Sequence, residues 1–196
     1  MDNLQMAMPS IRSFVAIELS PDTKAQIEEI QNKLKASSAD VRWVRSEGMH
    51  LTLKFLGGIQ EEQIPEIADV LTHCSAETGR FNLTIHSLGA FPNETNPKVI
   101  WIGVEDESRR LETLQQCIEE GLAPIGFKAE KRAFTPHLTL GRLKSPKGRR
   151  AVGQLLEASR ECDCGTSTVQ EIFLFKSDLK PSGAVYTKLK TFALSE

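Results

Sequence analysis

Apolar and polar residues alternate along several short stretches of this chain, and segments with the periodicity of a helix separate these stretches. Strict alternation predicts half-buried β-strands, whereas apolar residues three and four positions apart predict amphipathic helices. Strands are predicted over residues 11–19, 41–44, 49–56, 81–88, 98–104, 168–175 and 185–194, and a further strand contains residues 137–140. Helices are predicted to begin at Ser20-Pro21, to span residues 64–74 and 111–122, and to follow the segment 145–148.

The order of these elements indicates an internal repeat. The same order of elements occurs twice: helix, strand, helix, strand, strand. The tetrapeptide His-Leu-Thr-Leu lies in the first strand of each copy, at residues 50–53 and 137–140. His50 and His137 are 87 residues apart, close to half of the 196-residue chain. Duplication of an α+β unit explains both observations. We therefore expect one α+β domain over residues 1–196, with two pseudo-symmetric lobes, each an antiparallel sheet with helices on its outer face, enclosing a central cleft.

Glycine and cysteine positions add local expectations. Gly57-Gly58 is predicted to break the first motif strand. Cys74 and Cys117 fall on apolar faces of predicted helices, whereas the two cysteines of residues 162–164 lie in a predicted polar loop. No Cys/His array has zinc spacing, so reduced, structural thiols are favoured over a soft-metal site in that loop.

The composition is that of an ordinary globular protein, with 40% hydrophobic and 26% charged residues. A net charge of −2 argues against broad electrostatic wrapping of nucleic acid, but it allows a local basic cleft that grips a chain end. No stretch resembles a transmembrane span or a secretory leader. We expect a cytoplasmic monomer without a membrane partner.

The repeated tetrapeptide carries the candidate chemistry. In an extended strand, His and Thr lie on one face and the two leucines on the other. One such tetrapeptide is ordinary in an amphipathic strand, but two copies in a chain with only 4 histidines are not. Two imidazoles that face each other across a cleft can take a proton from a nucleophile and give one to a leaving oxygen, without a metal ion.

These residues resemble a known family, the 2H phosphoesterases, which are defined by two His-x-Thr/Ser-x motifs. Within it, the chain is similar to the RNA 2',3'-cyclic phosphodiesterases, also described as 2'-5' RNA ligases. The similarity rests on residues 12–17 (RSFVAI), 50–57 (HLTLKFLG) and 135–142 (TPHLTLGR), and on the C-terminal segments 173–177 and 183–194. Gly141 departs from the bulkier residues common at that position.

The resemblance implies hydrolysis of RNA 2',3'-cyclic phosphate ends to 2'-phosphate ends, without a cofactor or metal. By position, His137 is the general base for water and His50 the general acid for the 3'-oxygen. Thr52 and Thr139 would donate hydrogen bonds to the non-bridging phosphoryl oxygens, and Arg142 would stabilise transition-state charge.

Two further residues are candidate substrate contacts. Phe14 could stack on the terminal base, although a core position is an equal alternative. Lys54 is predicted on the His/Thr face, where it could contact backbone phosphate, with a solvated lysine as the alternative.

Other functions remain open. Ligation of 2'-5' RNA ends uses the same site in reverse, although water at about 55 M favours hydrolysis. A non-catalytic binder of nucleotides or RNA ends is less compatible with two complete motifs. A metal-dependent hydrolase is least favoured, because the carboxylates are scattered.

Overall fold

The computed structural model describes residues 10–181 and 183–196 of the chain. The strands are β1 (Ile11–Glu18), β2 (Val41–Trp43), β3 (His50–Ile59), β4 (Phe81–Phe91), β5 (Val99–Glu105), β6 (His137–Leu143), β7 (Asp163–Val169), β8 (Glu171–Lys180) and β9 (Gly183–Ala193). The α-helices are α1 (Pro21–Lys35), α2 (Ile64–Ala76), α3 (Arg110–Leu122) and α4 (Arg149–Ala158), and two short 3-10 helices are η1 (Ser46–Gly48) and η2 (Glu61–Gln63). None of the helices in the described part of the chain combines the length and apolar composition needed to span a bilayer.

Local sequence signals explain the element boundaries. Ser20 caps α1, since its hydroxyl accepts a hydrogen bond from the backbone N–H of Thr23 at 3.2 Å, and Pro21 occupies the first helical position. The alternating strands and the helices with apolar stripes lie close to where the periodicity predicts them.

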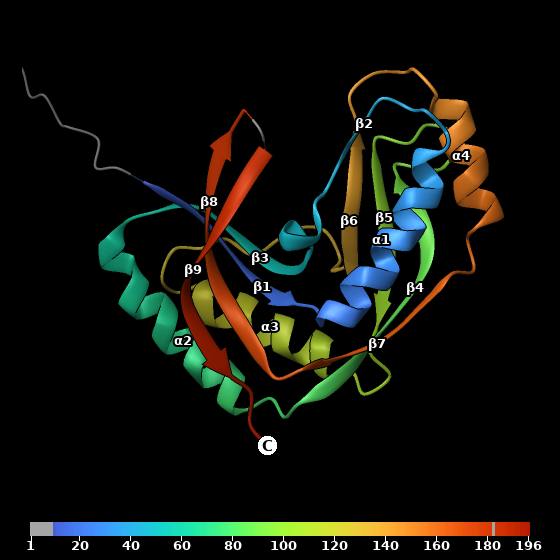
Figure 1. Ribbon diagram of the computed structural model, residues 1–196. Helices are drawn as coiled ribbons and strands as arrows, with labels where there is room; N and C mark the ends of the chain where they lie inside the picture. Colours follow the sequence, from blue (N-terminus) through green and yellow to red (C-terminus); the bar gives the residue numbers. More distant parts are fainter. Residues whose placement is uncertain (1–9, 182) are drawn as a thin grey trace, which may run out of the picture.

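The strands form two antiparallel sheets, one in each lobe (Figure 1). The first sheet has the order β3-β1-β8-β9, and the second has the order β2-β6-β5-β4-β7. The two motif strands, β3 and β6, contact each other where the lobes meet. Helices α2 and α3 cover the first sheet, and α1 and α4 cover the second. The predicted α+β fold of two lobes is therefore confirmed.

The lobes are not two consecutive halves of the chain, as a simple duplication would give. Strands β8 and β9, from the C-terminal end, complete the sheet that begins with β1 and β3. Helix α3 precedes the second motif strand but packs on β3, and α1 precedes the first motif strand but packs on β7. Each lobe therefore contains elements from both halves, and the fold interleaves the repeat.

The crossing between lobes explains one wrong boundary. Residues 168–175 were predicted as one strand, but β7 ends at Val169 in the second sheet and β8 begins at Glu171 in the first. Val169 and Ile172 are both buried, so the apolar pattern runs through the crossing without a visible break.

Gly57-Gly58 does not end β3, which continues to Ile59. Gly57 adopts a φ of +74° where the pairing with β1 shifts register, so the glycine allows an irregularity within the strand rather than its end.

The cysteine predictions are partly wrong. Cys74 and Cys117 form a disulfide that links α2 to α3, rather than reduced thiols. The prediction that both cysteines lie on apolar helix faces was correct. Periodicity within one helix, however, cannot show which residue of a second helix packs against that face. Cys164 lies inside β7 and is buried, not in a polar loop, and both Cys162 and Cys164 are free.

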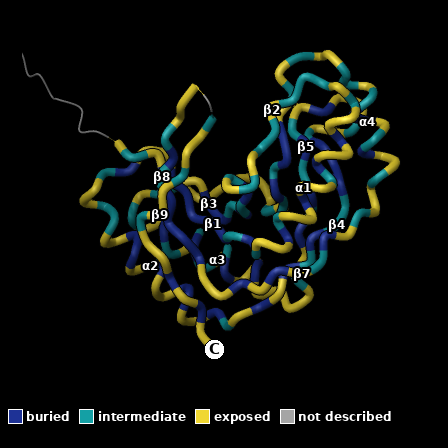
Figure 2. The backbone as a smooth tube through the Cα atoms, viewed as in Figure 1, coloured by how far each residue is buried: buried dark blue, intermediate teal, exposed yellow. Residues whose placement is uncertain are grey.

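The main hydrophobic core fills the space between the sheets and their helices, and buried residues follow the strands in Figure 2. A second, smaller cluster lies on the opposite face of the first sheet, and consists of Phe14, Ala16, Phe173 and Phe175 with Tyr186 against it. This aromatic cluster borders His50 and forms part of the candidate site.

Candidate active site

His50 and His137 begin β3 and β6, and both side chains are half-buried. The Nδ1 atom of His50 lies 2.9 Å from the carbonyl oxygen of Gly48, and that of His137 lies 2.6 Å from the carbonyl oxygen of Thr135. A carbonyl oxygen only accepts, so each Nδ1 carries the hydrogen and donates it. In the neutral imidazole each Nε2 therefore has a free lone pair. The two histidines share one tautomer and one mode of anchoring.

The predicted alternation of half-buried and buried side chains holds over the four residues of each motif. Leu51, Leu53 and their counterparts Leu138 and Leu140 are buried, whereas both threonines are half-buried on the histidine side. Beyond this point both strands contain an extra residue. The pairing register shifts between Val15 and Ala16 opposite β3, and between Ile100 and Trp101 opposite β6.

These bulges reverse the alternation after Leu53 and after Leu140. Lys54 and Gly141 consequently turn inward, and Phe55 and Arg142 turn outward onto the face of the motif threonines. The bulge in β6 is supported from α1, because the buried amide of Gln31 donates to the carbonyl oxygen of Leu140 at 2.9 Å. Arg142 therefore shares a face with His137 and Thr139.

The predicted position of Lys54 is wrong. Its side chain is buried behind the sheet, where Nζ donates to Glu119 on α3 at 2.5 Å and to the carbonyl oxygen of Lys128 at 3.0 Å. The bulge is the physical reason, since alternation alone would have placed Lys54 beside Thr52. Lys54 is a buried structural residue whose ion pair with Glu119 links β3 to α3.

Aromatic rings surround His50. The ring of Phe14 stacks on the imidazole with 4.7 Å between centroids, and Tyr186 meets it edge-on at 4.9 Å. Burial lowers the pKa of His50 to about 4, and the bond to the Gly48 carbonyl offsets only part of this shift. His50 is therefore neutral in the free protein near pH 7.

The predicted base contact of Phe14 does not fit this geometry. Phe14 is only 3% exposed, and it stacks on His50 and on Phe175, with 5.2 Å to the latter centroid. A side chain this deeply buried has no open ring face for a base, so the core alternative is correct.

Two aromatic side chains of the second lobe, which also contact each other, lie beside His137. Phe91 meets its imidazole edge-on at 5.0 Å, and the Trp101 ring centroid is 6.4 Å away. Gly89 leaves room for this indole, because a Cβ there would lie 2.3 Å from Trp101. Sequence analysis missed Phe91 and Tyr186 as neighbours of the histidines. Tyr186 is the only tyrosine in the chain, but only the strand pairing brings it to His50.

Comparison with known proteins decides the family. The family model described as 2'-5' RNA ligase superfamily matches residues 13–181, a span that contains both histidine motifs. The chain belongs to the 2'-5' RNA ligase superfamily.

Similar proteins cover almost the whole chain. A Methanothermobacter thermautotrophicus protein named RNA 2',3'-cyclic phosphodiesterase is 33% identical over 184 residues, which are 94% of this chain and 99% of the relative. A Thermotoga maritima protein of the same name is 33% identical over 181 residues, covering 91% of this chain and 93% of the relative. The resemblance inferred from the motifs is therefore confirmed.

Solved structures support the same assignment. A Thermus thermophilus protein superposes with a TM-score of 0.81 at 28% identity, covering 94% of this chain and 98% of its own. E. coli LigT in apo form gives a TM-score of 0.77 at 27% identity, covering 96% and 99%. LigT structures also exist in complex with 3'-AMP, ATP and NADP+.

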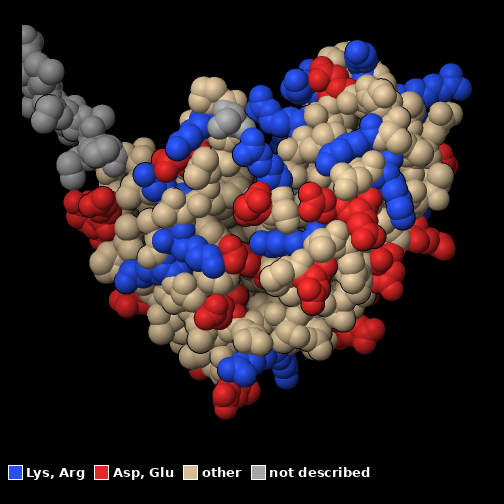
Figure 3. Space-filling model, viewed as in Figure 1, with Lys and Arg blue, Asp and Glu red and all other residues tan. Residues whose placement is uncertain are grey.

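Two arginines lie side by side at the candidate site of this superfamily member. Figure 3 shows the surface hollowed between the lobes, with Lys and Arg side chains along its upper walls and Asp and Glu side chains at its lower edge. Arg142 is exposed and pairs across the β2–β6 ladder with Arg42. Burial raises the pKa of Tyr186, whereas the charges of Arg142 and Arg12 act in the opposite direction. Arg142 of the second lobe is thus close enough to act electrostatically on Tyr186 of the first.

Gly141, where the chain departs from the family pattern, has a structural reason. A Cβ at this position would lie 2.6 Å from the side chain of Val41 and 3.0 Å from that of Trp43. The glycine therefore lets β2 approach β6 and brings Arg42 beside Arg142.

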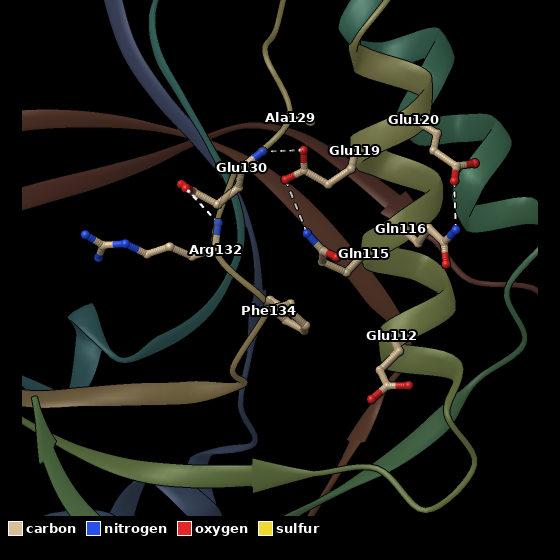
Figure 4. A pocket seen from close by; sticks show the side chains of 9 residues that line it. All are labelled: Glu112, Gln115, Gln116, Glu119, Glu120, Ala129, Glu130, Arg132 and Phe134. Carbon is tan, nitrogen blue, oxygen red and sulfur yellow. Dashed lines mark hydrogen bonds between the residues drawn. The ribbon is translucent and has the colours of Figure 1, made fainter.

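A separate pocket of about 440 Å³ lies between α3 and the segment 129–134, outside the histidine site (Figure 4). Four glutamates line it, at positions 112, 119, 120 and 130, with Arg132 as the single cation. An anionic phosphate is therefore poorly suited to this pocket. Within residues 10–181 and 183–196, no three His, Cys, Asp or Glu side chains are placed to share a metal ion.

Proposed function

We propose that this protein hydrolyses RNA ends that carry a 2',3'-cyclic phosphate and leaves a 2'-phosphate, by metal-independent acid–base catalysis between His50 and His137. The observation that carries the proposal is the common anchoring of the two imidazoles. Each Nδ1–H donates to a backbone carbonyl, so each Nε2 is free for proton transfer. The names of the curated relatives support the same substrate.

The reaction needs one proton removed and one supplied. Nε2 of neutral His137 takes a proton from water as the oxygen attacks phosphorus in line with the P–O3' bond. That bond breaks, and protonated His50 gives its Nε2 proton to the departing 3'-oxygen. The hydroxyls of Thr52 and Thr139 donate to the non-bridging oxygens, and Arg142 offsets their charge.

The scheme requires protonated His50, but burial lowers the pKa of this residue in the free protein. A bound phosphodiester anion beside the imidazole favours the charged form and raises the pKa. Proton uptake by His50 therefore accompanies substrate binding. In the free protein the buried, neutral His50 avoids the cost of an uncompensated charge.

The adenine nucleotides bound by E. coli LigT support a nucleotide-sized ligand for this chain too. The superfamily description favours one second function, the joining of 2'-5' RNA ends. Ligation breaks the same P–O3' bond of the cyclic phosphate, with an RNA 5'-hydroxyl as the nucleophile in place of water. A non-catalytic binder would bind these ends without turnover.

The test uses a labelled oligonucleotide that ends in a 2',3'-cyclic phosphate, with the product end mapped. The proposal predicts a 2'-phosphate and no ligated product in the absence of a 5'-hydroxyl partner. His50→Ala and His137→Ala should each lower kcat by about 10²–10⁴. Their double variant should be far less than multiplicatively worse, because the two residues act as a unit. Binding without turnover would overturn the proposal.

A further inference from the structure

Gln31 is a polar residue on the face that α1 packs against the second sheet. The buried residues of α1 are Thr23, Ile27, Gln31 and Leu34, and Gln31 is only 3% exposed. Burial of an amide is unfavourable unless its hydrogen bonds are made, so an apolar residue would be the ordinary choice at this position. The contacts of Gln31 give a reason for the polar side chain.

The amide of Gln31 connects three parts of the chain. Its Nε2 atom donates to the carbonyl oxygen of Val44 at 2.8 Å and to that of Leu140 at 2.9 Å. The two N–H groups of this amide are therefore both in use. The backbone N–H of Val44 also donates to the Leu140 carbonyl, at 2.9 Å. Gln31 thus closes a junction between α1, β6 and the segment that follows β2.

Leu140 is the extra residue in the bulge of β6. In the pairing with β5, the partners pass directly from Thr139 to Gly141, which leaves Leu140 without one. A bulge interrupts the ladder, so other contacts must hold its extra residue. Gln31 supplies such a contact to the Leu140 carbonyl. Because this bulge turns Arg142 onto the face of the motif threonine, Gln31 also holds the orientation of Arg142.

The second carbonyl leads to the other histidine. Val44 lies just before η1, and Gly48, the last residue of η1, accepts the Nδ1 hydrogen of His50 at 2.9 Å. Helix α1 also contacts η1 directly. Gln31 therefore binds both the strand that carries His137 and the segment that leads to the anchor of His50. One buried side chain connects the supports of two imidazoles that belong to different lobes.

We propose that Gln31 is a positioning residue, which fixes the two imidazoles relative to each other and keeps Arg142 on the face of His137. This inference rests on the proposed function, in which an acid and a base must both reach one phosphate. A misplacement of about 1 Å can lower a rate about 100-fold, even when the substituted residue lies away from the chemistry. Gln31 acts in this way, through the β6 bulge and through η1.

The first test replaces Gln31 with methionine, which has a similar shape but no N–H donor. Gln31→Met should lower kcat/KM for adenosine 2',3'-cyclic phosphate by about 10- to 100-fold, at a temperature where circular dichroism shows the variant to be folded. Gln31→Asn, which is too short to reach both carbonyls, should also lower kcat/KM, and it takes the place of Gln31→Met if that variant does not fold. Full activity of the folded variant would overturn the inference.

Thr23→Val is the matched control. Thr23 is also a buried polar residue of α1, and its hydroxyl donates to the carbonyl oxygen of Thr166 on β7 at 3.2 Å. Strand β7 is an edge of the second sheet, separated from β6 by β4 and β5. Thr23→Val therefore removes a buried hydrogen bond of the same helix without touching a motif strand, and kcat/KM should not change. Equal losses in Thr23→Val and Gln31→Met would overturn the inference.

A double-mutant cycle separates positioning from a general structural role. Arg142→Ala should lower kcat/KM of the wild type, but it should have little further effect in Gln31→Met, because Arg142 has then already lost its place. A merely structural role of Gln31 would leave the effect of Arg142→Ala unchanged. Effects that multiply in the double variant would therefore overturn the inference.

Binding distinguishes this inference from the hydrolysis proposal. Calorimetric titration with adenosine 2'-phosphate gives the same cycle in Kd without turnover. If Arg142→Ala weakens binding by the wild type but not by Gln31→Met, and no protein hydrolyses the cyclic phosphate, the proposed hydrolysis fails and the positioning of Arg142 stands. If the wild type and Gln31→Met hydrolyse it equally well, only the positioning role fails.

Discussion

The imidazole of His50 lies stacked against the ring of Phe14, with 4.7 Å between the ring centroids and 28° between the ring planes. The stacked ring keeps water from one face of the imidazole, while Nδ1 keeps its bond to Gly48. The charged imidazolium loses hydration in this environment, which is why burial lowers the pKa of His50. The aromatic cluster therefore sets the protonation state of a candidate catalytic residue.

Phe14→Ala should raise the pKa of His50 from about 4 toward its ordinary value of 6.5, because water then reaches the imidazole. NMR titration of the imidazole resonances measures this directly. Leu179→Ala is the control, since it exposes no histidine. Addition of inorganic phosphate to the wild type should also raise the pKa, by charge rather than by hydration. A His50 pKa that stays near 4 in Phe14→Ala would show that the stacked ring is not its cause.

The same shift makes the stability of the fold depend on pH. Unfolded His50 takes up a proton near pH 6.5, but folded His50 does so only near pH 4. The unfolded state binds more protons between these values, so the free energy of unfolding falls as pH decreases through this window. The contribution reaches about 3 kcal/mol below pH 4. Urea unfolding of wild type and His50→Gln at several pH values isolates it from the carboxylates. If the free energy of unfolding changed with pH in the same way in both proteins, the burial of a neutral imidazole would be contradicted.

Lys54 should behave as a structural residue. Its ion pair with Glu119 is nearly inaccessible, with side-chain exposures of 3% and 14%. Lys54→Met should lower the free energy of unfolding by about 3–5 kcal/mol, because a buried carboxylate loses its partner. The double variant Lys54→Met/Glu119→Leu should recover much of this loss. Denaturant unfolding measures both, and KM for a cyclic phosphate substrate decides the role. A rise in KM without loss of stability would restore Lys54 as a substrate contact.

Some of this site could be predicted from sequence and some could not. Alternation placed His50 and Thr52 on one face because both precede the bulge, and the same rule failed at Lys54 because an extra residue leaves no mark in an apolar pattern. Arg142 was assigned by family resemblance, since alternation from His137 would have placed it on the opposite face. The bulge in β6 places Arg142 on the face of His137 and Thr139, and its role in catalysis stays a prediction.

The fold, too, could be predicted from the sequence only in part. Periodicity found the helices, since each buries one stripe, but pairing between distant elements is set by tertiary packing. The Cys74–Cys117 disulfide and the contacts of α1 with β7 depend on such packing. The contact between Tyr186 and His50 also depends on tertiary packing, because the two residues are 136 positions apart in the sequence.

Hydrolysis should proceed at an undiminished rate in excess EDTA. Two imidazoles with free Nε2 atoms supply both proton transfers, so water needs no metal ion to activate it. Initial rates with and without chelator, on a cyclic phosphate end, measure this. Activity that disappears with EDTA and returns with a divalent ion would contradict the two-histidine mechanism.

Sulfur in place of a bridging oxygen should distinguish the acid from the base. A thiolate leaves without a proton, because a thiol has a pKa near 8.5, far below that of an alcohol. With sulfur at the 3' position, His50→Ala should lose less than about tenfold in kcat, against about 10²–10⁴ for the oxygen substrate. His137→Ala should stay equally impaired with both, since water must still be deprotonated. Rapid kinetics on the two cyclic substrates measures this difference. If instead sulfur at the 2' position rescues His137→Ala, the 2'-oxygen is the leaving group. The product then carries a 3'-phosphate, and the roles of the two histidines are exchanged.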